Sequence, residues 1–172
     1  MAVSNAAPQG SANSGYEADV LVIGGGPAGT WAAIQAAQAG ASVILADKGY
    51  CGSSGATAAA GTAVWYVDPD PQKRQAAMAS RYEMGGRLAD AGWMSRVLDQ
   101  TWDGINTLAD WGYPFPQDAA GVSRRNSLQG PEYMRLMRKQ VKQAGGKILD
   151  HHPVLELLRD ACLLYTSDAA DE

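Results

Sequence analysis

A glycine-rich turn between an apolar run and a helical pattern is the feature that most constrains this fold. Val20–Ile23 is a short continuous apolar run, as expected for a buried parallel strand. The turn Gly24-Gly-Gly-Pro-Ala-Gly29 follows, and residues 27–39 are good helix formers that stop at Gly40. In this setting the G-x-G-x-x-G spacing predicts a dinucleotide-binding turn. Its first glycine permits a tight turn, its second lets the backbone approach a pyrophosphate, and its third allows close packing of helix on strand.

A second apolar run completes a β-α-β unit. Residues 42–47 predict a strand, and a right-handed crossover would place it beside the first strand. The helix N-terminus between them offers unpaired N–H groups and a partial positive charge to a pyrophosphate. Asp47 ends the second strand, where an acid accepts hydrogen bonds from an adenosine ribose and disfavours a 2′-phosphate. Two alternatives remain for this unit: NAD, which the same unit also binds, and a glycine-rich turn without a ligand.

The segment after Asp47 favours FAD over NAD. Residues 48–55 are rich in glycine and serine, and residues 56–60 form a run of small side chains. They predict a loop and a helix start that can lie against a large flat cofactor and offer backbone N–H groups to its phosphate and ring. A nicotinamide enzyme more often proceeds directly into the next helix. We therefore expect FAD as the cofactor.

The remainder of the chain predicts a mixed α/β domain. Proline-rich turns separate helical patterns, and the expected helices are 72–84, 92–111 and 131–144. The further expected strands are 63–67, 147–150 and 154–158. The predicted fold class is α/β, a Rossmann-like FAD-binding domain with a parallel central sheet. Residues 67–130 would add helices at the periphery of that sheet.

Composition excludes several other classes of protein. The chain has 172 residues and a formal net charge of −4, with its lysines and arginines scattered, so no nucleic-acid partner is expected. No apolar run approaches the roughly 20 residues that a membrane span needs. Only two cysteines occur, so no disulfide framework is expected and a reducing compartment is indicated. A cytoplasmic protein with a small-molecule substrate is the prediction.

The two ends of the chain differ from the part between them. Residues 1–15 are rich in Ala, Ser, Asn and Gly and predict a disordered tail. Residues 162–172 resemble the in-frame translation of a transposase-type sequencing adapter, so we expect this tail to be non-native. The predicted FAD-binding domain is therefore 16–161, and it is expected to be incomplete.

Three segments carry a resemblance to a known family. The turn 24–29, the loop 53–61 and the segment Gly145-Gly-Lys-Ile-Leu-Asp150 resemble the flavoprotein-subunit family of fumarate reductase and succinate dehydrogenase, which includes L-aspartate oxidase. The resemblance implies an FAD-dependent oxidoreductase, a dicarboxylate as the possible substrate, and an electron-transfer partner that the sequence does not identify. It also implies that residues 148–150 rejoin the sheet next to the strand that ends at Asp47.

The resemblance implies where each part of FAD would bind. The pyrophosphate would lie against Gly24, Gly25, Gly26, Pro27, Ala28 and Gly29. The adenosine end would lie near Asp47 and Lys48, and the backbone of Val154 would face the adenine. The loop with the isoalloxazine would comprise Ser53, Ser54, Gly55, Ala56, Thr57 and Gly61. Members with covalent FAD carry a histidine about where Gly55 stands, so FAD should be bound non-covalently here.

Some functions stay open at the level of sequence. In the family that the chain resembles, the substrate-binding and proton-delivering histidines and arginines come largely from a capping domain and the C-terminal half. The resemblance therefore implies that this chain is truncated before the capping domain, and that the catalytic residues, which are unknown, are beyond residue 161. An NAD(P)H-dependent flavoprotein of another class, or an inert fragment that is inactive alone, are the alternatives. Cys51 invites a redox role, but no second cysteine follows before Cys162, so a structural role is favoured. No metal site is predicted, because adjacent His151 and His152 would point to opposite faces of an extended segment.

Overall fold

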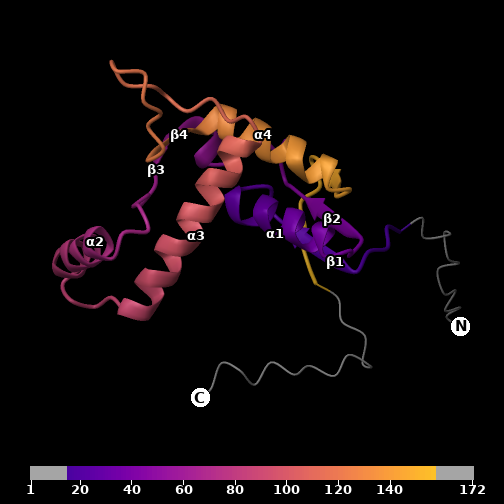
Figure 1. The fold of residues 1–172 in the computed structure, drawn as a ribbon. Coiled ribbons are helices and arrows are strands. Elements are labelled where there is room, and N and C mark those ends of the chain that lie inside the picture. Colours follow the sequence, from indigo (N-terminus) through magenta and orange to yellow (C-terminus); the bar gives the residue numbers. More distant parts are fainter. Residues whose placement is uncertain (1–14, 158–172) are drawn as a thin grey trace, which may run out of the picture.

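The computed structural model describes residues 15–157 of the chain. Three parallel strands form the central sheet, with helices α1 and α4 on one face, and a long helix, α3, crosses beside them (Figure 1). The order of the strands is β1-β2-β5. This confirms the predicted α/β class with a parallel sheet. The expectations for the first fourteen residues and for residues 158–172 fall outside the described residues.

The first β-α-β unit follows the sequence prediction closely. It comprises β1 (Val20–Ile23), α1 (Pro27–Gln38) and β2 (Val43–Ala46). The two strands pair in parallel with Val20 opposite Val43. Pro27 is at the first position of the helix, where its missing N–H costs no hydrogen bond, and Gly40 ends it with a φ of +95°. The left-handed conformation at Gly40 favours glycine, so the predicted helix stop is confirmed.

The third strand comes from the far end of the described chain. Strand β5 (Lys147–Leu149) pairs in parallel with β2, with Ile148 opposite Leu45. This confirms that residues 148–150 lie next to the strand that ends at Asp47. A further strand at 154–158 was expected, and that prediction is wrong for residues 154–157, which have no strand partner. Leu158 lies outside the described residues.

Helix α4 (Gly130–Gln143) closes the crossover from the loops back to β5. Its buried residues include Tyr133, Met134, Met137 and Val141, spaced for one helix face. That face packs against α1 and against a short 3₁₀ turn, η1 (Thr57–Ala59). The helix predicted at 131–144 is therefore confirmed to within a residue.

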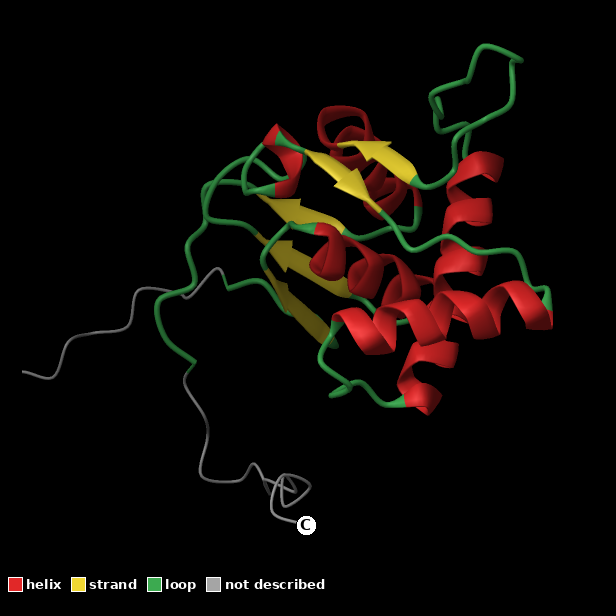
Figure 2. Cartoon of the chain, turned by 90° about the vertical axis from the view of Figure 1, so that its left-hand side faces the viewer, coloured by secondary structure: helices red, strands yellow, loops and turns green. Residues whose placement is uncertain are grey.

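A second, antiparallel pair of strands lies beside the parallel sheet (Figure 2). Strand β3 (Gly61–Ala63) pairs with β4 (Ser127–Gln129), and Thr62 is opposite Leu128. The sequence predicted a strand later, at 63–67, and gave no sign of β4. The three-residue ladder depends on tertiary contacts. Gln129 donates its N–H to the hydroxyl of Tyr113 at 2.6 Å, and Gly130 donates to the carbonyl of Ala60 at 2.9 Å.

Two helices between these strands form a peripheral hairpin. Helix α2 (Pro71–Met84) packs against α3 (Ala91–Asp110) and has no buried residue, and it lies on the side of α3 away from the parallel sheet (Figure 1). Both helices begin at an aspartate. The side chains of Asp70 and Asp90 accept hydrogen bonds from the N–H groups of Lys73 and Trp93, each at 2.8 Å. The predicted peripheral helices in 67–130 are thus confirmed.

The core lies on one face of the parallel sheet. Val43 and Leu45 of β2 join α1, α3 and α4 in a continuous buried cluster. The alternate residues of β1 point to the other face, where Leu21 and Ile23 are 51% and 53% exposed. Parallel strands are usually buried on both faces. Within residues 15–157, helices α1 and α4 therefore cover only one side of β1.

Candidate dinucleotide site

Backbone geometry alone requires glycine at the first and last glycines of the motif in the turn between β1 and α1. Gly24 has a φ of +98° and donates its N–H to the carbonyl of Ala46 at 2.8 Å. A Cβ atom on Gly29 would lie 1.9 Å from the carbonyl oxygen of Gly24. This contact is the close approach of helix to strand that the glycine spacing predicts. The first and last glycines of the motif therefore have structural roles that no other residue could fill.

The middle glycine of the motif faces open space. Gly26 is extended, with a φ of −74°, and a Cβ atom there would meet no heavy atom within 4 Å. Ala28 and Gly29 follow in the first turn of α1, where backbone N–H groups have no partner within the helix. Thr30 is fully buried, and its hydroxyl donates to the carbonyl of Gly26 at 2.9 Å. The helix N-terminus can thus receive an anion without displacing a side chain at Gly26.

The carboxylate of Asp47 joins this turn to the loop after β2. Its Oδ2 accepts the N–H of Gly25 at 2.6 Å, and its Oδ1 accepts the N–H of Gly49 at 2.7 Å and the hydroxyl of Ser54 at 2.9 Å. Burial alone would favour the neutral acid, yet these three donors hold the pKa of Asp47 below its ordinary value. The bonds use three of about four acceptor positions of the carboxylate. Sequence reasoning anticipated a ribose contact here and missed this bridging role.

Cys51 fills the space between the loop and the turn. Its side chain is fully buried, and its Sγ lies 3.7 Å from the carbonyl oxygen of Gly25. A Cβ atom on Gly25 would lie 2.7 Å from that sulfur and 2.7 Å from Oδ2 of Asp47, so no larger residue fits at Gly25. Burial raises the pKa of the Cys51 thiol and keeps it protonated. The site therefore uses Cys51 for packing, in agreement with the structural role favoured from the sequence.

An ion pair between Arg138 and Asp150, which sequence reasoning missed, contacts the loop that contains Cys51. The guanidinium of Arg138 on α4 makes two parallel bonds of 2.7 Å to the carboxylate of Asp150. It also donates to the carbonyl of Cys51 at 2.8 Å. The residues after Asp150 add two backbone bonds of 2.8 Å, from His151 to Gly49 and from His152 to Asp47. The only signal in the sequence is Arg138 directly after Met137, at the border of the apolar face of α4.

The structure brings together some of the predicted cofactor residues and leaves others apart. Hydrogen bonds join Asp47, Gly25 and Ser54 directly. Thr57 belongs to η1, against the start of α4, and Gly61 belongs to the β3–β4 ladder. Outside the glycine turn, the other predicted residues are exposed in loops: Lys48, Ser53, Gly55, Ala56 and Val154. Within the turn and the start of α1, Ala28 is exposed and Pro27 is half-buried. Within the described residues, no hydrogen bond joins Gly61 or Val154 to Asp47.

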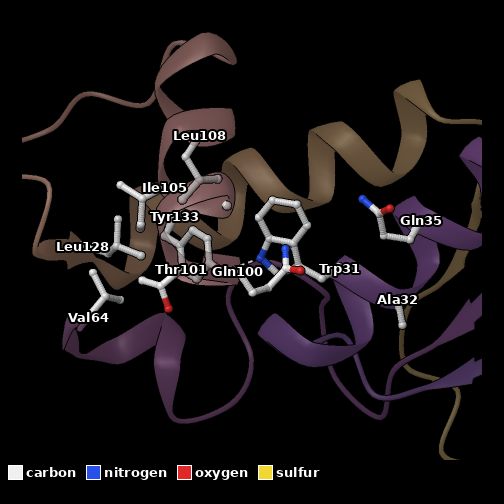
Figure 3. A pocket seen from close by; sticks show the side chains of 11 residues that line it. Trp31, Ala32, Gln35, Val64, Gln100, Thr101, Ile105, Leu108, Leu128 and Tyr133 are labelled. Carbon is white, nitrogen blue, oxygen red and sulfur yellow. Dashed lines mark hydrogen bonds between the residues drawn. The ribbon is translucent and has the colours of Figure 1, made fainter. Parts of the chain in front are cut away.

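A cavity of about 530 Å³ lies apart from these residues, between α1, α3 and the β3–β4 pair (Figure 3). Trp31 of α1 lines it, stacks on Trp111 at a centroid distance of 5.2 Å, and donates its indole N–H to Tyr133 at 2.9 Å. The lining shares no residue with the predicted cofactor site; it comprises Trp31, Ala32, Gln35, Val64, Gln100, Thr101, Gly104, Ile105, Leu108, Leu128 and Tyr133. The cavity is therefore separate from the glycine turn and from Asp47.

Neither a metal cluster nor a bilayer-spanning helix occurs in residues 15–157. No three His, Cys, Asp or Glu side chains in this range gather in a way that could hold a metal ion. Over the same range, every helix is too short or too polar to cross a bilayer.

Comparisons with known proteins agree with this geometry. A family model described as FAD binding domain matches residues 19–166. One subunit of the fumarate reductase (CoM/CoB) of Methanothermobacter marburgensis is 29% identical over 124 residues, which are 70% of this chain and 22% of that protein. The prediction of an FAD-binding domain related to fumarate reductase flavoproteins, with FAD as cofactor, is confirmed.

Two solved structures share the fold. The quinol fumarate reductase FrdA of E. coli superposes with a TM-score of 0.74 at 24% identity, over 85% of this chain and 28% of that one. The 3-ketosteroid-Δ4-(5α)-dehydrogenase of Rhodococcus jostii superposes with a TM-score of 0.59 at 24% identity, over 79% of this chain and 38% of that one. The chain thus spans between about a fifth and two fifths of the length of these relatives.

Proposed function

Because this chain belongs to the FAD binding domain family, we propose that it is the FAD-binding part of a flavin-dependent oxidoreductase of the fumarate reductase and succinate dehydrogenase class. The observation that carries the proposal is the family match over residues 19–166, which begins just before β1 and includes the whole glycine turn. The proposed FAD-binding part of the chain is 16–161. FAD would supply the hydride-transfer chemistry, and the residues of this chain would bind and orient it.

The glycine turn fits the pyrophosphate of FAD. The open space at Gly26 and the free N–H groups at the start of α1 support binding of the phosphates at residues 24–29. Asp47, which lies at the end of β2 and has one acceptor position left, would accept a ribose hydroxyl. Lys48 and the backbone of Val154 would lie at the adenosine end. The loop from Ser53 to Gly61 would face the isoalloxazine.

We propose that the flavin is held without a covalent bond. No histidine is present in the loop 48–61. Gly55 also has a φ of +87°, a conformation that a histidine side chain would strain.

The substrate and partners are proposed from the named relative alone. That relative is one subunit of a fumarate reductase, which supports a dicarboxylate substrate and a multisubunit enzyme for the whole protein that contains this chain. The 172-residue chain alone is proposed to be inactive, because it spans 22% of that relative. A cytoplasmic location is proposed from the low cysteine content.

Purification of the protein encoded by the full-length gene tests the proposal. The expected result is a yellow protein with flavin absorption bands, and copurified NAD in place of flavin would refute the proposal. Precipitation with acid should leave a colourless pellet and release FAD into the supernatant. Colour retained in the pellet would contradict the non-covalent link.

A further inference from the structure

Arg138 contacts three consecutive residues of the loop that follows β2. Its guanidinium lies 4.0 Å from the centre of the Tyr50 ring and donates to the carbonyl of Cys51 at 2.8 Å. A Cβ atom on Gly52 would lie 3.3 Å from its Cδ. A planar guanidinium stacks on a ring and at the same time makes two parallel hydrogen bonds to one carboxylate, and an ammonium group lacks this planar fork. The contact is therefore specific to arginine.

Asp150 also binds this loop, through hydrogen bonds to Arg138 and to Cys51. Its carboxylate binds Arg138 through two bonds of 2.7 Å and accepts the N–H of Cys51 at 2.9 Å. Both backbone polar groups of Cys51 are thus bonded to side chains from α4 and from the end of β5. The side chains of Arg138 and Asp150 are only 14% and 21% exposed, so solvent screens the pair less than a surface ion pair.

Cys51 links Arg138 and Asp150 to the glycine turn by direct packing. Its buried side chain lies against Gly25, where no Cβ atom would fit. Gly25 in turn donates its N–H to Asp47 at 2.6 Å. A shift of Cys51 would therefore displace the turn and the acid together, because the packing between them leaves no free space.

We propose that Arg138 is a positioning residue for FAD. Together with Asp150 it fixes Cys51, and through Cys51 it holds residues 24–29 and Asp47 in the arrangement that receives the pyrophosphate and adenosine of FAD. The inference rests on the proposed FAD site at these residues. It requires that loss of the Arg138 fork weakens binding of the adenosine end, while a ligand that carries only the isoalloxazine end is unaffected. If Arg138 only stabilised the fold, its substitution would lower the melting temperature and leave the ligand affinities of the folded protein unchanged.

The test uses the full-length flavoprotein with Arg138→Lys, which keeps the charge and removes the planar fork. Arg135→Lys is the matched control, because Arg135 pairs with Glu132 on the same helix and its side chain is 72% exposed. Apoprotein is titrated with FAD, with ADP and with riboflavin, which carries the isoalloxazine ring and no phosphate. Arg138→Lys should raise the dissociation constants for FAD and ADP by the same factor, on the order of tenfold. The dissociation constant for riboflavin should not change. Arg135→Lys should stay within about twofold of the wild type for every ligand.

Each contrary result is distinct. Unchanged FAD and ADP affinities with a lower melting temperature would show that Arg138 only stabilises the fold. An equal loss of affinity for riboflavin would refute the restriction to the pyrophosphate and adenosine end. Failure of the wild-type apoprotein to bind FAD would refute the proposed function before any variant is compared. If Arg138→Lys does not fold, the double variant Arg138→Met/Asp150→Leu, which buries no unpaired charge, replaces it with the same expected results.

Discussion

The backbone N–H of Gly25 donates a hydrogen bond of 2.6 Å to the carboxylate of Asp47, 22 residues further along the chain. This bond ties the turn after β1 to the end of β2. Because the same carboxylate also accepts from Gly49 and Ser54, one side chain organises both loops that border the proposed FAD site. Removal of its charge, by mutation or by acid, should therefore affect both loops.

Asp47→Asn should weaken both the fold and the binding of FAD. The amide offers one neutral oxygen to three donors, and its NH₂ group would face an N–H or a hydroxyl. Loss of hydrogen bonds to a buried charged acceptor destabilises a protein by about 2 kcal/mol. FAD affinity should fall on the order of tenfold as the ribose loses its acceptor. Urea denaturation and FAD titration measure the two effects. Asp19→Asn, at an exposed aspartate bonded to Ser42, is the control and should leave FAD affinity unchanged.

Acidification should destabilise the wild type more than it destabilises Asp47→Asn. The pKa of Asp47 in the folded protein is below its ordinary value, so its stabilising effect is complete above about pH 4 and is lost as the pH falls through the folded pKa. Asp150 acts in the same direction, since Arg138 lowers its pKa. Free energies of unfolding at neutral and acid pH provide the comparison. An identical loss in both proteins would show that Asp47 does not contribute.

Two glycine substitutions should separate binding from folding. In Gly26→Ala the new methyl group enters open space at an allowed φ, so the melting temperature should be retained while FAD affinity falls, because the methyl occupies the path of the pyrophosphate. In Gly29→Ala the methyl would meet the carbonyl of Gly24 at 1.9 Å, so the fold should lose about 1–3 kcal/mol. Circular dichroism melts and FAD titration distinguish the two. Full FAD affinity in Gly26→Ala would place the pyrophosphate elsewhere.

Cys51 should resist alkylation in the folded protein. Its thiol is buried and its pKa is raised, so little thiolate is present at neutral pH. Iodoacetamide should modify residue 51 slowly in native buffer and rapidly in urea, as read by peptide mass spectrometry, which reports on this cysteine alone. Fast modification of the native protein would mean that the loop opens readily and that Cys51 does not hold Gly25 in place.

Local patterns made the first β-α-β unit predictable. The apolar run of β1, the glycine turn and the stop at Gly40 each depend on neighbours in sequence, so the bounds of β1 and α1 agree with expectation to within a residue. Strand β4 was not predictable in this way, because Ser127–Gln129 is ordered by the Tyr113 hydroxyl and by contacts of Gly130 with the loop before β3. The strand expected at 154–158 was inferred from apolar residues alone, and residues 154–157 have no neighbouring strand to pair with.

In the candidate site, too, features set by local sequence were predictable and features set by tertiary contacts were not. The glycines and Asp47 were found because their spacing follows from the geometry of a dinucleotide turn. Arg138 and Asp150 were not found. They form a bidentate ion pair between α4 and the residue after β5, and no sequence motif or hydrophobic periodicity predicts such a pair. Cys51 has two roles that only the structure shows. Its side chain packs against Gly25, and its backbone is hydrogen-bonded to Arg138 and Asp150.

Among the described residues, β1 is an edge strand of the parallel sheet, and it carries the exposed side chains of Leu21 and Ile23. An edge strand with two apolar residues is a template onto which another chain can add by main-chain hydrogen bonds. We therefore expect the isolated polypeptide to aggregate in a concentration-dependent way. Dilute samples should scatter little light, and concentrated ones should grow stacked aggregates that begin at β1. A lysine in place of Leu21 should delay that growth without changing the turn that follows the strand.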